Sequence, residues 1–298
     1  MYIKIEDKDK DKALVILLLT HIRFDMALVK AKELAVIRKS FPGLRFIVSV
    51  NPSKEMREYK PNDIKSVISQ LNIYADQVLF TPYGMGAYEH FFYATSNADI
   101  RYILITADDD QFDYDQMKII LEKFFSKELI IYSKIVGFNV KAGFKGGQQN
   151  EISFNGYCSC NRVDRVESFL KNPNDFIVYF IYDRIFLEEY LFRNLFVNWI
   201  LVPARLKHRR IAYLMVFEML FDNVIQFIDD GNPLVTFYLE NGSSIEKNNI
   251  PFLTIIDVQL IWRMFVSLIS TNINKKSYKL WFAFIKFSIL RIKHGAFR

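Results

Sequence analysis

Three consecutive carboxylates, Asp108, Asp109 and Asp110, follow directly after the apolar segment 100–106. Like charges this close repel one another and raise the pKa of at least one member, so the cluster needs a cation to stabilise it. Mg²⁺ or Mn²⁺ fits best, because these ions take one or two carboxylates and leave other positions to water and phosphate oxygens. The triplet therefore predicts a divalent-metal site that neutralises the charge on a departing diphosphate.

Within this site we assign Asp108 and Asp110 to the metal and Asp109 to the sugar or ribose, although adjacent aspartates could exchange these roles. In the alternative interpretation the triplet simply opens the next helix, where carboxylates stabilise the positive N-terminal end. The position of the triplet after the fourth strand of an alternating series favours the metal site.

The elements that must position the triplet alternate between apolar strands and helices. The predicted strands are 13–20, 45–50, 77–81 and 100–106, and the predicted helices between them are 25–40, 61–71 and 87–97. This alternation predicts an α/β fold, a mostly parallel sheet flanked by helices, with ligands at the carboxyl ends of the strands. We therefore expect Thr20, Asn51, Pro82 and Asp108 to gather along one edge of the sheet.

The chain beyond the triplet loses this rhythm and becomes dense in aromatic residues. Its predicted elements are a helix at 114–125, a strand at 129–140 and helices at 163–170, 184–196 and 211–227. The glycine-rich, basic segment 141–149 is either a mobile lid over phosphates or a plain hairpin connection. We predict one α/β domain at 13–210 and a helical C-terminal region at 211–298.

The order of elements over residues 13–135 resembles glycosyltransferase family 2 and related bacterial enzymes of the GT-A fold. In these enzymes a first strand ends in a threonine-containing loop with a nearby arginine, and a later strand ends in an Asp-X-Asp motif. Thr20-His21-Ile22-Arg23 is similar to the first feature, and Asp108-Asp109-Asp110 is similar to the second. The chain lacks the family's usual Pro-Thr-Tyr-Asn-Arg stretch, and only Asn51 represents the Asp that commonly follows the second strand.

The resemblance implies that 13–210 binds a nucleotide-sugar and that 211–298 faces the acceptor or a membrane. Thr20 and Arg23 would lie beside the base and phosphates, and Asn51 near the ribose or base. The ordinary alternatives are a strand-end cap for Thr20 and a surface position for Arg23. His21 is interpreted as a loop histidine.

An inverting transferase also needs a base that removes the proton of the acceptor hydroxyl. In family 2 this base is an acidic residue on a helix that follows the donor half. Glu218 and Asp222 are four residues apart, hence on one face of a helix, in about the right region. We predict that one of them is the base, with Asp183, Glu188 and Glu189 as competitors.

The net charge of +6 is concentrated in the second half, in 205–210 and from residue 275 onward. Such patches attract the phosphates of nucleic acid, of anionic lipid or of pyrophosphate-linked substrates. In 275–293, lysines line one stripe of a predicted helix that is otherwise largely apolar. This helix either makes a peripheral membrane contact or packs on the protein with its lysines in solvent.

No secretory signal and no membrane-spanning segment are expected, because the N-terminal run is charged and the apolar stretches are too short. The 2 cysteines are too few for a disulfide framework or a four-ligand zinc site. We expect a cytoplasmic protein whose membrane contact, where it exists, is peripheral at the inner face.

The sequence thus predicts a metal-dependent glycosyltransferase that moves a sugar from a nucleotide-diphosphate-sugar donor. The expected acceptor is a surface glycan such as lipopolysaccharide, O-antigen or capsule, free or lipid-linked. One alternative is a nucleotidyltransferase that makes such donors, but 20–25 contains no glycine for the phosphate loop of those enzymes. Another is a non-enzymatic nucleic-acid-binding protein, but no small module with interleaved basic and aromatic residues occurs, so we expect no nucleic-acid partner.

Overall fold

The computed structural model describes residues 13–21, 23–52, 61–81, 85–126, 129–143, 149–152, 154, 156–171, 180–192, 208–228, 232–238, 261–262, 264–265, 268 and 278–294. The chain divides into two compact units. The first comprises Met1–Ile152, Tyr179–Leu191 and Gln226–Asn241, and the second comprises Ser153–Val178, Phe192–Ile225 and Gly242–Arg298. The chain therefore passes between the units repeatedly, whereas the sequence predicts a single boundary after residue 210.

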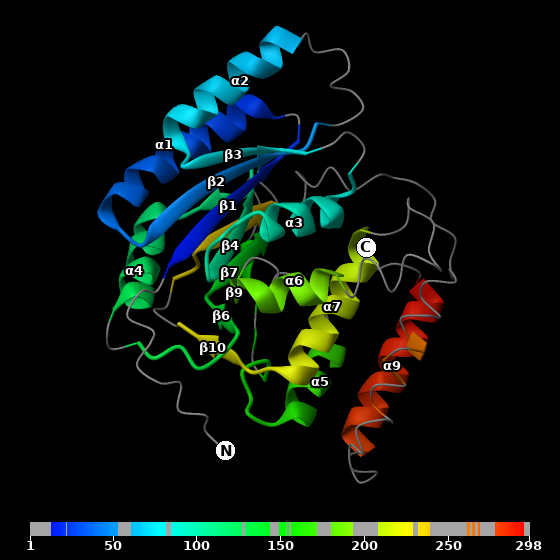
Figure 1. The fold of residues 1–298 in the computed structure, drawn as a ribbon. Coiled ribbons are helices and arrows are strands. Elements are labelled where there is room, and N and C mark those ends of the chain that lie inside the picture. Colours follow the sequence, from blue (N-terminus) through cyan, green and yellow to red (C-terminus); the bar gives the residue numbers. More distant parts are fainter. Residues whose placement is uncertain are drawn as a thin grey trace. The chain divides into compact units, whose positions relative to one another are not determined.

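A seven-stranded, mostly parallel sheet with the strand order β10-β6-β9-β4-β1-β2-β3 forms the centre of the first unit (Figure 1). The first four strands in the chain are parallel to one another. They are β1 (Leu14–Thr20), β2 (Leu44–Val50), β3 (Gln77–Phe80) and β4 (Tyr102–Ala107). All seven residues of β1 are buried, as expected of a central strand whose first six residues are aliphatic. The predicted α/β fold is confirmed.

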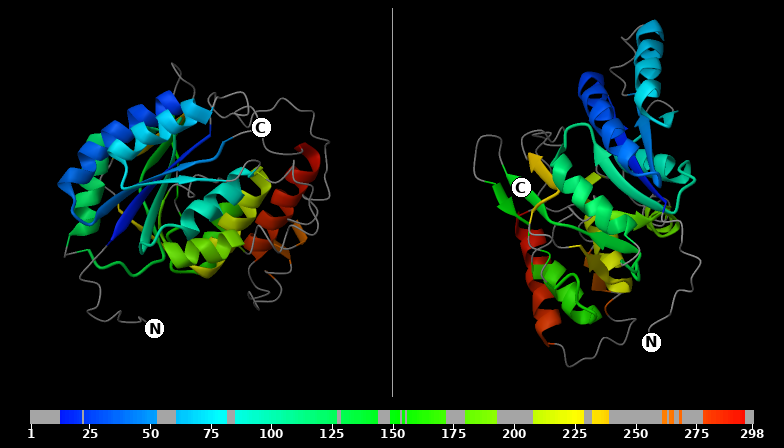
Figure 2. Two further views of the ribbon diagram at one scale, coloured as in Figure 1. Left: turned by 45° about the horizontal axis from the view of Figure 1, so that its top comes forward. Right: turned by 90° about the vertical axis from the view of Figure 1, so that its left-hand side faces the viewer.

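Helices cover both faces of this sheet. The connecting helices are α1 (Phe24–Ser40), α2 (Pro61–Tyr74) and α3 (Ala87–Ser96). Figures 1 and 2 show α1 and α2 side by side on one face and α3 on the other. Helix α4 (Tyr114–Phe125) lies beside α1, because Phe125 stacks on Phe41 with ring centroids 5.8 Å apart.

The strand order reverses between β1 and β4, since the chain moves from β1 to β2 and β3 and then returns to the other side of β1. In open α/β sheets the crevice beyond the carboxyl ends of the strands at such a reversal is the usual ligand site. Thr20 ends β1, and the aspartates follow β4 at this point. The reversal therefore positions the candidate site.

The rest of the sheet comes from distant parts of the chain. Strand β9 (Ile181–Asp183) lies between β4 and β6 (Ile135–Gly137) and is antiparallel to both, and β10 (Ile225–Phe227) pairs beyond β6. Two predictions are wrong here. The strand expected at 129–140 is reduced to β6, and the helix expected at 211–227 is α7 (His208–Asp222) followed by β10. Each apolar run is divided between two elements, and its composition does not reveal the break.

A second, four-stranded sheet has the order β5-β11-β7-β8. Its strands are β5 (Gln111–Phe112), β11 (Val235–Tyr238), β7 (Val140–Gly143) and β8 (Gln149–Glu151). Strands β7 and β8 are antiparallel neighbours, as the hairpin interpretation of 141–149 expects. Because β4 ends at residue 107 and β5 begins at residue 111, the aspartate triplet lies in a turn that links the two sheets.

The second unit is helical. Helix α5 (Arg162–Lys171) contacts α7 and α9 (Tyr278–His294). Phe217 of α7 packs against Phe169 of α5, and the buried Arg165 donates from Nε to the carbonyl oxygen of Leu220 at 2.7 Å. A basic side chain at the end of a helix satisfies carbonyls that have no partner within the helix. The expected aromatic-rich helical region is confirmed, and it includes α5.

No helix in the part of the chain that the structure describes is both long and apolar enough to cross a bilayer.

Candidate functional site

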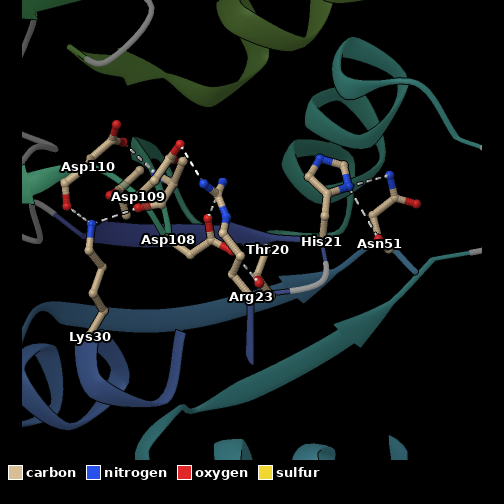
Figure 3. Close-up of polar contacts among 10 residues, drawn as sticks. Thr20, His21, Arg23, Lys30, Asn51, Asp108, Asp109 and Asp110 are labelled. Atoms are coloured by element: carbon tan, nitrogen blue, oxygen red, sulfur yellow. Dashed lines mark hydrogen bonds and ion pairs between the residues drawn. The ribbon is translucent and has the colours of Figure 1, made fainter. Parts of the chain in front are cut away.

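The residues of the candidate site converge at the carboxyl ends of β1, β2 and β4 (Figure 3). The backbone N–H of Asn51 donates to the carbonyl oxygen of Thr20 at 2.9 Å, and the hydroxyl of Thr20 donates to Asp108 Oδ2 at 2.7 Å. The predicted convergence of Thr20, Asn51 and Asp108 is therefore confirmed. Pro82, the fourth expected member, lies outside the described residues.

Asp108 is buried, and side chains occupy both of its oxygens. Besides the bond from Thr20 to Oδ2, Nη2 of Arg23 lies 2.7 Å from Oδ1. Burial raises the pKa of Asp108, and the repulsion of Asp109 adds to this, while Thr20 and Arg23 partly offset the rise. The sequence argument put charge repulsion first, whereas desolvation is the larger cause in the folded protein.

Arg23 bridges two members of the triplet. Its Nη1 donates to Asp109 Oδ2 at 2.8 Å while Nη2 contacts Asp108. Burial alone would lower the pKa of Arg23, but the charges and hydrogen bonds of the two aspartates outweigh it. Because 30% of its side chain is exposed, Arg23 is the cation of the site that also reaches solvent. It is not an isolated surface residue.

Asp110 is turned inward. Its Oδ2 accepts from the backbone N–H of Ala107 at 2.8 Å, which closes the turn after β4. Burial raises the pKa of Asp110 to about 7, with the charges of Asp109 and Asp108 adding to the rise and Lys30 opposing it. The protein thus leaves the negative charge of this carboxylate incompletely compensated.

Lys30 of α1 fixes the turn at residues 107–110, which we call the aspartate turn. The sequence did not lead us to predict this role. Its ammonium donates to the carbonyl oxygen of Ala107 at 2.8 Å and to that of Asp110, and it lies 5.3 Å from the ring centroid of Phe112. Burial lowers the pKa of Lys30, and the three nearby aspartates oppose this. A signal was present, because Lys30 falls within the otherwise apolar stripe of α1 that includes Ala27 and Leu34.

The alternative role of the triplet, as the start of the next helix, does not hold. Strand β5 separates the triplet from α4, and Asp113 is the residue that caps the helix. Oδ1 of Asp113 accepts from the backbone N–H of Gln116 at 2.9 Å. The three aspartates therefore do not serve as helix caps.

A second polar cluster lies at the same edge of the sheet, around Asn51. This side chain is buried; its Oδ1 accepts from the Thr81 hydroxyl at 2.7 Å, and its Nδ2 donates to the carbonyl oxygen of Met85 at 3.1 Å. Nδ1 of His21 lies 3.3 Å from both the backbone oxygen and Nδ2 of Asn51. His21 is therefore part of the site edge and not only a loop residue.

His90 of α3 extends this cluster into the core. Its Nε2 lies 2.8 Å from Ser49 Oγ, and its ring meets that of His21 edge to face at 5.5 Å between centroids. Among the described residues, no hydrogen-bond partner reaches His90 Nδ1. Burial lowers the pKa of His90 to about 3, and the proximity of His21 adds to this, so the imidazole is neutral at physiological pH. The cluster is therefore polar but uncharged around His90.

The candidates for the acceptor base are spread over both units. Glu218 and Asp222 lie on α7 in the second unit, Glu218 half-buried and Asp222 exposed. In the first unit, Asp183 pairs with Lys134 at 3.0 Å, and Glu188 pairs with Arg184 at 2.9 Å. The assignment of the base to Asp222 or Glu218 stays a prediction.

Comparisons with known proteins identify the fold and no closer relationship. No family model matches the chain, and no curated protein matches it either. Among solved structures, S. aureus TarS 1-349 in complex with UDP-GlcNAc has a TM-score of 0.56 at 11% identity, covering 94% of this chain and 73% of that chain. Its complex with UDP gives a TM-score of 0.54 at 10% identity, with 94% and 71% covered.

A longer TarS structure gives a TM-score of 0.51 at 12% identity over 92% of this chain and 43% of that chain. These likenesses confirm the predicted GT-A type fold and, at this level of identity, nothing beyond the fold. Within this GT-A fold the aspartate turn occupies the sheet edge at the strand-order reversal, where ligands of such sheets bind.

The aspartate turn could supply carboxylate ligands to a divalent cation that also binds the oxygens of a diphosphate. Within the described residues, no three His, Cys, Asp or Glu side chains form a group that could hold a metal ion alone. One or two carboxylates suffice for Mg²⁺ or Mn²⁺ when water and phosphate oxygens complete the shell. Although Thr20 and Arg23 contact Asp108, each carboxylate oxygen has a second lone pair. The raised pKa values of Asp108 and Asp110 also fit a site that a further cation stabilises.

Proposed function

We propose that this protein is a divalent-metal-dependent glycosyltransferase that uses a nucleotide-diphosphate-sugar. The observation that carries the proposal is the aspartate turn at the strand-order reversal of a GT-A sheet. Arg23 pairs with its carboxylates, and Lys30 bonds its carbonyl oxygens. The complexes of the similarly folded TarS with UDP and UDP-GlcNAc support this class of donor.

Asp108 and Asp110 are the proposed ligands of Mn²⁺ or Mg²⁺, and Asp109 is the proposed contact of the sugar or ribose. When bound, the cation neutralises the negative charge that grows on the diphosphate as the bond to the sugar breaks. Arg23 is partly exposed beside Asp108 and Asp109, so its guanidinium can also pair with a phosphate oxygen. Lys30 fixes the turn by bonding the carbonyl oxygens at both of its ends.

The nucleoside would lie toward Asn51, with Thr20 between it and the aspartates. The neutral polar groups around Asn51 suit a base or ribose, which exposes hydrogen-bond donors and acceptors but no full charge. In this proposal the phosphates bind at the charged part of the edge and the nucleoside at the neutral part.

The proposed acceptor is a surface glycan, such as lipopolysaccharide, O-antigen or capsule, free or lipid-linked. Asp222 or Glu218 would remove the proton of its hydroxyl, and the reaction would take place in the cytoplasm or at the inner face of the membrane. The aromatic side chains of the second unit, among them Phe169 and Phe217, are of the type that packs on sugar rings, but these two are buried in the core. Recognition of the acceptor therefore falls to other residues.

The test is a panel of UDP-, GDP- and dTDP-sugars, assayed for binding and slow hydrolysis with Mn²⁺, with Mg²⁺ and with EDTA. We expect one nucleotide class to bind, hydrolysis to need the metal, and Asp108→Ala and Asp110→Ala to abolish it. Asp115→Ala is the matched control, because Asp115 is an exposed aspartate on the nearby α4.

Two results contradict the proposal: hydrolysis that does not respond to EDTA, or full activity in both variants. Consumption of a nucleoside triphosphate with a sugar 1-phosphate would instead identify a nucleotidyltransferase.

A further inference from the structure

Helix α9 has one face buried in the second unit. Leu280, Ala283, Phe284 and Phe287 are at most 7% exposed, and the helix contacts α5. Phe284 also stacks on Phe265, with centroids 6.2 Å apart. This face anchors the helix to its unit, so the opposite face is displayed in a fixed orientation relative to α5.

The opposite face is apolar where a surface helix is normally polar. Phe282, Ile285 and Ile289 are 70%, 52% and 56% exposed. Their spacing of three and four residues places them in one stripe along the helix, roughly opposite the buried residues. Single exposed apolar residues are common on protein surfaces, but a continuous stripe of three marks an interaction surface.

The charge of α9 indicates what this surface binds. The 17 residues of the helix include no aspartate or glutamate, and the exposed Lys286 lies one turn after Phe282. Basic residues beside an exposed apolar stripe match a surface that offers both phosphate groups and hydrocarbon.

A fourth large apolar residue belongs to the same part of the second unit. Trp262 is 61% exposed, and its ring lies 5.7 Å from that of Phe265, which in turn contacts Trp281 of α9 at 6.1 Å. Tryptophan favours the boundary between lipid headgroups and hydrocarbon, since one edge of its ring is polar.

We propose that the exposed face of α9 docks on an anionic membrane surface, with Phe282, Ile285 and Ile289 inserted at the headgroup boundary and Lys286 paired with lipid phosphate. The helix lies in the plane of the interface and does not cross the bilayer. A second copy of the chain fits this face less well, because two such faces would bring their lysines together. The inference does not rest on the proposed transferase activity.

The test is flotation of the full chain with vesicles, in the absence of any sugar donor. We expect binding to vesicles of equal parts phosphatidylglycerol and phosphatidylcholine, little binding to phosphatidylcholine alone, and release by high salt. The combined variant Phe282→Ser, Ile285→Ser and Ile289→Ser should bind at least about tenfold more weakly, since about 1.4 kcal/mol corresponds to tenfold and a buried apolar side chain contributes more than this. The single variant Lys286→Glu should weaken binding to anionic vesicles more than it weakens binding to neutral vesicles.

The matched control removes the same number of exposed apolar residues from α1. Met26, Val29 and Val36 are 42%, 55% and 64% exposed, and their replacement by serine should leave vesicle binding unchanged. Circular dichroism of both triple variants checks that they fold. Binding by the α9 variant equal to that of the intact chain overturns the proposal. So does a dimer of the intact chain that dissociates in this variant without any vesicle binding, because the face would then belong to a second copy.

Discussion

The two polar clusters at the edge of the central sheet are built on opposite principles. The aspartate turn gathers three carboxylates and compensates them with the cations Arg23 and Lys30. The cluster around Asn51 and His90 joins neutral groups, and burial keeps the imidazole of His90 uncharged. A ligand with a charged end and a neutral end would find a matching environment at each. The contrast also means that the two clusters should respond differently to mutation, to charge removal and to pH.

The largest effect is expected where the aspartate turn loses its buried cation. Lys30→Met removes the donor to two carbonyl oxygens and the charge nearest Asp110, so we expect a loss of about 3 kcal/mol in the free energy of unfolding. Urea unfolding measures it. Lys32→Met is the control, because Lys32 is an exposed lysine on the same helix and should cost less than about 0.5 kcal/mol. Equal losses in the two variants would mean that Lys30 does not hold the turn.

The next largest effect is expected on ligand binding, where the two clusters should bind different parts of the donor. Arg23→Gln should weaken binding of a nucleoside diphosphate about 30-fold, since a charge-assisted hydrogen bond contributes about 2 kcal/mol, while binding of the nucleoside alone changes little. Calorimetric titration with UDP and uridine, or with the pair that the donor panel identifies, measures both. Arg38→Gln is the control, because Arg38 lies in the last turn of α1 and pairs with Asp76 at 2.9 Å, not with the aspartate turn. If nucleoside binding fell as much as diphosphate binding, Arg23 would not mark the phosphate end.

A pH effect of one sign is expected from Asp110. The folded pKa of about 7 lies above the ordinary 3.8, so the folded protein binds the extra proton between these values. This contribution to stability is fully present below pH 3.8 and is lost as the pH rises through 7, at up to about 1.4 kcal/mol per pH unit. Urea unfolding in EDTA from pH 5 to 8 should show this slope as the difference between the intact chain and Asp110→Asn. Parallel stability curves for the two proteins would contradict it.

His90 should have the opposite effect on the free energy of unfolding, which should decrease as the pH falls. Its pKa falls from 6.5 to about 3 on folding, so the unfolded chain binds the extra proton between these values. Stability from this group is complete above pH 6.5 and decreases as the pH falls toward 3, again at up to about 1.4 kcal/mol per unit. His90→Gln cannot titrate and should remove this slope in the same unfolding series. A slope that persists in the variant would assign it to other groups.

The part of the fold that surrounds both clusters could be predicted from sequence. Segments 13–20, 45–50 and 100–106 are aliphatic enough to be strands buried on both faces, and helices of the right length separate them. Parallel strands bring their carboxyl ends together, so the meeting of Thr20, Asn51 and Asp108 followed from the order of elements alone. The prediction worked because each step rested on a long, periodic segment.

The remainder of the site could not be predicted because its signals are short or lie within other patterns. β9 and β10 are three residues each, too short for a periodicity, and an apolar helix precedes β10 directly. Lys30 interrupts the apolar stripe of α1, but the sequence does not show that its ammonium reaches the carbonyl oxygens of Ala107 and Asp110. The role of His90 depends on Ser49 and His21, which reach it only after the sheet and α3 have packed.

Because β9 lies between β4 and β6 in the sheet, one edge of β4 stays unpaired during synthesis until β9 has been made. Strands β1 to β4 can pair once residue 107 has left the ribosome, but the open side of β4 waits for residues 181–183. Until then the newly made chain presents an unpaired strand edge next to its own aspartate turn, and such edges recruit other chains. We therefore expect stalled or shortened products that end before β9 to aggregate during synthesis, and shortened versions for crystallisation to need β9 and β10.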